Sequence, residues 1–92
     1  MQRYLIEVEH EPDFSACLRA IEVFLKTGSH FLTNADWGCR CGEHKAWIIV
    51  DMDSEEEARC IVPPEFRTRA KIVEVSKFTM DEVDEMRAYH VG

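Results

Sequence analysis

The chain has 92 residues, of which 46% are hydrophobic, and it carries a formal net charge of −7. This length and composition indicate a single globular domain, residues 1–92, rather than a disordered chain. The acidic excess argues against a nucleic-acid-binding surface, because phosphate contacts need clustered Lys and Arg, and against binding to an anionic membrane.

No apolar run approaches the roughly 18 residues that a bilayer-spanning helix needs. The first residues turn acidic where a secretory signal would need an apolar core. We therefore expect a cytoplasmic protein whose four cysteines are thiols rather than a disulfide framework.

The N-terminal part predicts a strand followed by a helix. Residues 3–9 alternate between two faces, as a half-buried strand does. Apolar residues then recur at helical spacing from Phe14 to Leu25, and Gly28 supplies a C-terminal cap. Cys17 falls within this spacing and is expected to be a small buried apolar residue, as is Cys60 further along the chain.

The next segment predicts a second strand and a hairpin. Residues 29–37 alternate, which places His30, Asn34 and Asp36 on one strand face. A turn follows at residues 38–43. If that turn pairs Trp37 with His44, Asp36 faces Lys45 and Asn34 faces Trp47, which would make the polar row an ordinary cross-strand arrangement.

The C-terminal half predicts a strand, a helix, a strand and a terminal helix. Residues 44–52 contain an apolar run on both faces, as in a central strand. Ser54 with Glu57 forms a capping box that opens a short helix, which two prolines end. Residues 71–78 predict a fourth strand, and a last helix is expected at about 80–90.

This order, β-α-β-β-α-β with a terminal helix, is the ferredoxin-like α+β arrangement, with a core at residues 3–78. Because the third strand is apolar on both sides, one sheet face would stay exposed in a monomer. The pattern resembles the dimeric α+β-barrel superfamily, whose members pack two such sheets face to face. That resemblance implies a homodimer, and it rests on architecture rather than on a residue motif.

Most of the candidate functional side chains lie in residues 30–44, and three interpretations of their function stay open. In the first, a small molecule is bound or converted in a cavity between the sheets of a homodimer, with His30 and Asp36 as an acid/base pair and Asn34 and Trp47 as ligand contacts. In the second, Cys39, Cys41 and His44 bind zinc or another transition metal. The chain could equally be a non-catalytic structural or regulatory interaction domain.

Redox chemistry at Cys39 and Cys41 is a further alternative, with Arg40 favouring the thiolate form. A C-x-C disulfide closes a small, strained ring that would be easily reduced. The spacing differs from the C-x-x-C of thioredoxin-like proteins. His10 precedes a helix, and no role is predicted for it.

Overall fold

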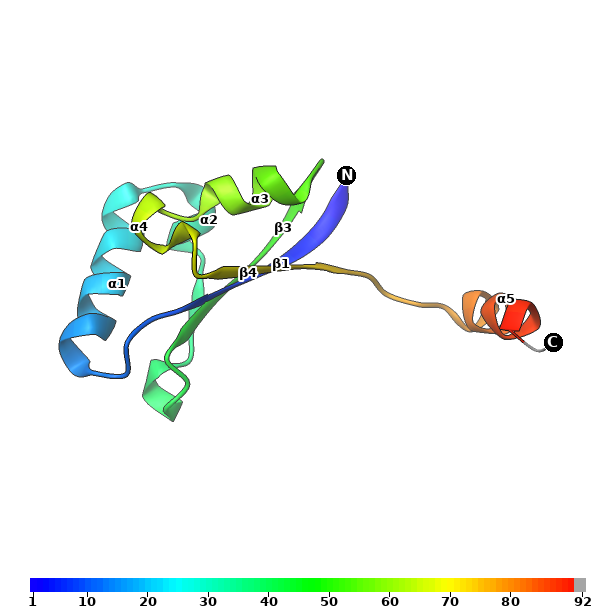
Figure 1. Ribbon diagram of the computed structural model, residues 1–92, viewed down its shortest axis with the longest axis horizontal. Coiled ribbons are helices and arrows are strands. Elements are labelled where there is room, and N and C mark those ends of the chain that lie inside the picture. The colour runs from blue at the N-terminus through cyan, green and yellow to red at the C-terminus, as the bar shows by residue number, and fades with distance from the viewer. Residues whose placement is uncertain (91–92) are drawn as a thin grey trace.

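A four-stranded antiparallel sheet and a layer of helices form the body of the protein (Figure 1). The computed structural model describes residues 1–90. The strands are β1 (Gln2–Glu9), β2 (Asp36–Trp37), β3 (Lys45–Met52) and β4 (Ala70–Val75). The helices are α1 (Phe14–Thr27), α2 (His30–Thr33), α3 (Glu55–Ile61), α4 (Pro64–Arg67) and α5 (Met80–His90), with a 3₁₀ turn, η1, at Cys39–Cys41.

The strand order β2-β3-β1-β4 places β1 and β3 in the centre of an open sheet. β1 pairs antiparallel with both neighbours, so that Leu5 lies opposite Ile49 on one side and Val73 on the other. The prediction of a mixed α+β domain is therefore confirmed. Among residues 1–90 the sheet is open at both edges and does not close into a barrel.

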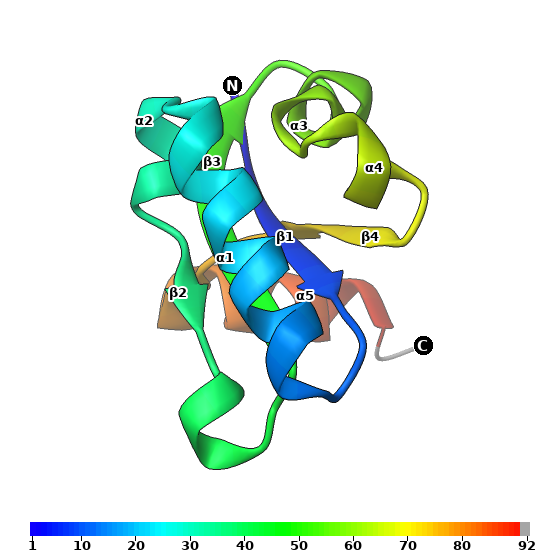
Figure 2. The same cartoon turned by 90° about the vertical axis from the view of Figure 1, so that its left-hand side faces the viewer.

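One face of the sheet is buried under the helices, as Figure 2 shows with α1 in front of the strands. Alternate residues of β1 and β3 point into this core, as their pattern predicts. They pack with Phe24 of α1 and with Leu32 and Val62, all three almost fully buried. The inward residues of the two strands are Tyr4, Ile6, Val8, Ala46, Ile48 and Val50.

Helix α1 forms where the spacing predicts it, with Asp13 as its N-cap and Gly28 as its C-cap. The Asp13 carboxylate accepts a hydrogen bond from the Ala16 backbone N–H at 2.8 Å. Gly28 has φ +72°, a left-handed conformation that glycine adopts without strain.

The strand predicted at residues 29–37 is wrong over most of its length. Ser29 caps the short helix α2 by accepting a hydrogen bond from the Leu32 backbone N–H at 3.1 Å, and only Asp36–Trp37 pair with β3. Leu32 is the physical reason, because the helical turn carries this side chain into the core. Local alternation resembled a strand, but burial of one leucine favoured a helix.

The hairpin register and the last strand also differ from the prediction. Asp36 lies opposite Trp47, not Lys45, because η1 and its flanking glycines take up more residues than a simple turn. Strand β4 ends at Val75, short of the predicted residue 78. The two prolines end α3 as predicted, but Pro64 then begins α4, consistent with the preference of proline for the first helical turn.

Candidate metal centre

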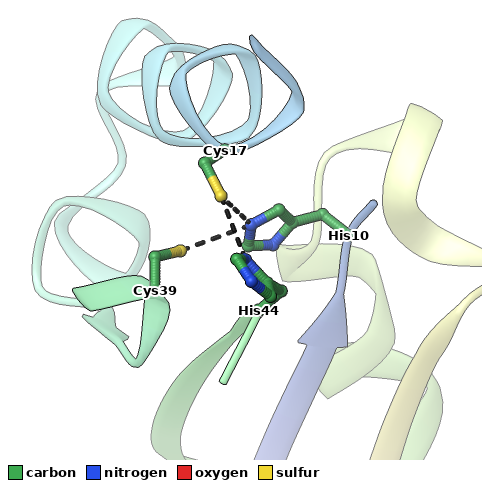
Figure 3. Close-up of side chains that lie close together, drawn as sticks. All are labelled: His10, Cys17, Cys39 and His44. Carbon is green, nitrogen blue, oxygen red and sulfur yellow. Dashed lines mark hydrogen bonds between the residues drawn. The ribbon is translucent and has the colours of Figure 1, made fainter. Parts of the chain in front are cut away.

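Two histidines and two cysteines meet at one end of the sheet (Figure 3). His10 directly follows β1, and Cys17 lies in the first turn of α1. Cys39 opens η1, and His44 directly precedes β3. One ligand atom from each residue lies within 4.8 Å of all the others.

The four side chains already contact one another through their ligand atoms. The Nε2 atom of His10 lies 3.0 Å from the Sγ atom of Cys17 and 3.3 Å from the Sγ atom of Cys39. The Nδ1 atom of His44 lies 3.2 Å from the Sγ atom of Cys17. Ligand atoms around a tetrahedral zinc ion are roughly 3.3–3.8 Å apart, given the usual Zn–N and Zn–S bond lengths. A small outward shift of the side chains would therefore make room for an ion.

Burial shifts the pKa values of two cluster residues, the buried His10 and the half-buried Cys39. His10 is only 4% exposed, and burial, with His44 and Arg69 nearby, lowers its pKa. The imidazole is therefore held neutral, which is the form that coordinates metals. Burial, together with the neighbouring Cys17, raises the pKa of the Cys39 thiol, so the metal-free site favours the thiol.

The two ring nitrogens of His10 have different surroundings. Its buried Nδ1 atom has no hydrogen-bond partner among residues 1–90. Both sulfur contacts of His10 use Nε2, so the ring is oriented by these contacts and by the edge of Trp37, whose ring centre is 5.8 Å away. Nε2 is therefore the His10 atom that faces both thiols. A metal bound there would leave the proton on Nδ1, the N–H that metal-bound histidines usually donate to a partner.

Backbone hydrogen bonds hold the chain around the cluster. The His10 N–H donates to the His44 carbonyl at 3.1 Å, which joins the ends of β1 and β3. The carbonyl of Gly38 accepts from both Cys41 and Glu43 at 3.0 Å, which closes the turn that carries Cys39. Gly42 ends this turn at φ +84°.

Helix α1 contributes its N-terminal end to the site. Cys17 is the fourth residue of the helix, and its N–H donates to the Asp13 carbonyl at 3.0 Å. The first turn of a helix is the positive end of its dipole, where a metal-bound thiolate is favoured.

The structure brings two of the three predicted metal ligands together. Cys39 and His44 join the cluster, but Cys41 is exposed and outside it. Cys17 is buried as expected, but its side chain lies in the cluster and not only among apolar core residues. Cys60 is exposed, contrary to the prediction. His10 was missed, although His10-x₆-Cys17 and Cys39-x₄-His44 form two His/Cys pairs that the sequence alone offered as a signal.

The polar residues predicted to line a cavity do share one surface. His30, Asn34, Asp36 and Trp47 lie around an open hollow of about 530 Å³ on the helix-free side of the sheet. They reach it from α2 and a short β2, not from one long strand. The Asn34 amide donates to the His30 carbonyl at 2.7 Å, so one of its donors is used within α2.

All four cysteines are free, including the Cys39 and Cys41 pair considered for redox chemistry. No described helix, within residues 1–90, has the length and apolar character to cross a membrane. No protein-family model matches the chain, and the searches of curated proteins and of solved structures found no match.

Proposed function

We propose that this chain is a metal-binding domain that holds one transition-metal ion between His10, Cys17, Cys39 and His44. The observation that supports this proposal is the convergence of four ligand atoms within 4.8 Å of one another, from four separate segments. Two thiolates and two imidazoles are a ligand set typical of zinc.

The proposed role of the ion is structural rather than catalytic. A catalytic zinc keeps a coordination position open for water, whereas four protein ligands fill a tetrahedral site. The ion would join the end of β1, the start of α1, the η1 turn and the start of β3. It would therefore hold the ends of these elements and the η1 turn together.

Metal stoichiometry tests this assignment. We expect the protein purified without a histidine tag to bind about one equivalent of zinc, as measured by elemental analysis after dialysis. Cys17→Ser and Cys39→Ser should each lose most of this binding. Cys41→Ser is the matched control, because Cys41 lies in the same turn but outside the cluster, and it should bind as the wild type does.

Two results would overturn the proposal. Binding of less than a tenth of an equivalent of zinc by the wild type would show that the cluster is not a zinc site. Loss of zinc in Cys41→Ser with retention in Cys17→Ser would restore the set expected from the sequence and exclude the cluster.

The second candidate function is binding of a small molecule in the hollow beside β3. Its volume of about 530 Å³ is in the range of ligand pockets, and it combines aromatic with polar walls. In this candidate His30 and Asp36 act as the acid/base pair, and Asn34 and Trp47 contact the ligand. The strand order β2-β3-β1-β4 supports a ferredoxin-like domain, and the exposed sheet face supports a homodimer that would enclose the hollow.

A screen of small metabolites by NMR tests this second candidate. The indole N–H of Trp47 donates to the Glu7 carboxylate at 3.0 Å, so it should give a well-resolved resonance. A ligand of the hollow should shift this signal and the side-chain amide of Asn34, and Asp36→Asn should weaken a ligand that Asp36 orients. If no compound shifts either signal, the hollow is not a ligand site.

A further inference from the structure

Helix α5 exposes its apolar side chains to solvent. Met80 and Met86 of α5 are 68% and 43% exposed, and Phe78, just before the helix, is 62% exposed. Figure 1 shows α5 at the end of an extended segment, away from the sheet and the other helices. In Figure 2 it lies behind the sheet, on the side opposite α1.

An isolated helix of this length needs a packing partner. α5 has 11 residues, and helices shorter than about 12–15 residues are marginal in water without tertiary contacts. Its Thr79–Glu82 capping box closes the N-terminus, with the Glu82 N–H donating to the Thr79 hydroxyl at 3.2 Å. Capping contributes only about 1 kcal/mol, so burial of its apolar side must supply the rest.

The helix-free face of the sheet offers a matching apolar surface. Ile49, Leu5 and Val73 lie side by side across β3, β1 and β4. Ile49 is 64% exposed and Val73 is 37% exposed, so the row is open at both ends. The hollow described above adjoins this row and shares Leu5 and Ile49 with it.

The charges on the two surfaces are compatible. Helix α5 carries four carboxylates and one arginine. The charged residues of the helix-free face nearly balance, and two pairs interact within it, Arg3 with Asp51 and Lys45 with Glu7, each at 3.6 Å. Three are basic and four are acidic: Arg3, Lys45, Lys71, Glu7, Glu9, Asp36 and Asp51. In a chain of net charge −7 this nearly neutral face repels an acidic helix less than the rest of the molecule does.

We propose that α5 of one copy packs on the helix-free sheet face of a second copy, and that the exchange is reciprocal. Residues 76–79 are extended and contain no Gly, Pro, Asn or Asp, so the chain lacks the residues that favour a reversal onto its own sheet. Met80, Val83 and Met86 follow at three-residue spacing and form the side of α5 that contacts the row of Leu5, Ile49 and Val73.

The area involved is sufficient for a stable dimer. In a two-fold interface every contact occurs twice. Burial of Phe78 and the three apolar residues of α5 in both copies, with the sheet surface that they cover, removes on the order of 1,500 Å² from solvent, which is the standard size of a specific interface. Each hollow would then be bordered by the helix of the other copy.

Cross-linking between two different variants tests the exchange directly. The background is Cys41→Ser with Cys60→Ser, since both residues are exposed and lie outside the metal cluster. One chain carries Val83→Cys, and the other carries Ile49→Cys. Under mild oxidation we expect a disulfide-linked heterodimer on a non-reducing gel, formed only when the two chains are mixed.

Sedimentation of the full chain provides a second, independent readout. The wild type should have twice the 10.7 kDa chain mass, and Ile49→Glu or Val83→Glu should reduce it to the monomer mass. Neither side chain lies in the core, so circular dichroism should be unchanged. Leu18→Glu is the matched control, because Leu18 is an exposed apolar residue on α1, and it should stay dimeric.

Three outcomes overturn the proposal. If the wild type sediments as a monomer, α5 does not pack on a second copy. Cross-linking within a single chain that carries both Val83→Cys and Ile49→Cys, without cross-linking between mixed chains, would mean that α5 folds onto its own sheet. If Leu18→Glu dissociates the dimer and Ile49→Glu does not, the dimer contact lies on the outer side of α1.

Discussion

His10 and Gly38 show how single residues shape the candidate metal centre. His10 brings a buried neutral imidazole to both thiols, and its position directly after β1 is set by the strand pairing. Gly38 allows the turn that carries Cys39 to pass close to β3. The sequence alone indicated Gly38 as a turn residue, but not the close approach that makes a larger side chain unfavourable.

Gly38→Ala is expected to weaken metal binding about 10-fold or more, as changes beside metal ligands do. A Cβ atom at this position would lie 2.8 Å from the Glu43 carbonyl oxygen and 2.8 Å from Cζ3 of Trp47, so the turn would have to shift and move Cys39. Zinc affinity by competition with a chromophoric chelator measures the effect. Gly42→Ala is the comparison, since nothing lies within 4 Å of its Cβ position and the alanine would be strained only by the φ of +84°. An affinity equal to that of the wild type in Gly38→Ala would contradict this role.

At the scale of elements, local signals predicted caps and strand faces correctly where short-range interactions decide them. The capping box of Ser54 and Glu57 begins α3, and the Glu57 N–H donates to the Ser54 hydroxyl at 3.2 Å. The alternation of β1 correctly separates its buried face from its open face. α2 was wrongly predicted as a strand because four residues give too little periodicity to distinguish the two structures.

Removal of the N-cap of α1 or of α3 is expected to lower the free energy of unfolding equally. Only removal of the α1 cap is expected to lower the affinity for zinc. Asp13→Ala and Ser54→Ala each remove one side-chain hydrogen bond to a helix N-terminus, which costs about 1 kcal/mol of unfolding free energy. Only Asp13→Ala should also weaken zinc binding, because α1 carries Cys17 in its first turn. Urea denaturation and zinc competition on both variants measure the two effects. A similar loss of zinc affinity in Ser54→Ala would indicate a general destabilisation instead.

At the scale of the whole molecule, the body is a two-layer domain from which α5 projects. The principal extents are 54 × 28 × 20 Å, and the long dimension follows the segment that leads to α5 (Figure 1). The proposed metal would reinforce the end of the sheet at which β1 and β3 meet the turn. A domain of this size has a small hydrophobic core, so the proposed ion would contribute a large share of its stability.

Chelation should therefore lower the melting temperature. Zinc at a free concentration 100 times its Kd stabilises the folded state by about 2.7 kcal/mol. For a domain of this length that corresponds to roughly 10–20 °C in Tm. Thermal unfolding with added zinc and with excess chelator measures the difference, and Cys39→Ser should show the low Tm under both conditions. An unchanged Tm in the wild type would argue against a structural ion.

The sequence by itself determined the class of fold, the buried faces of the central strands, the long helix and its caps, because these follow from periodicity and from hydrogen bonds between residues a few positions apart. It also directed attention to Cys39 and His44. Only the tertiary structure brought His10 and Cys17 to them. The contacting pairs are separated by 7, 27 and 29 positions, and no local pattern reports such distances. Strand pairing and the packing of α1 on the sheet decide which side chains converge, and these depend on the whole chain.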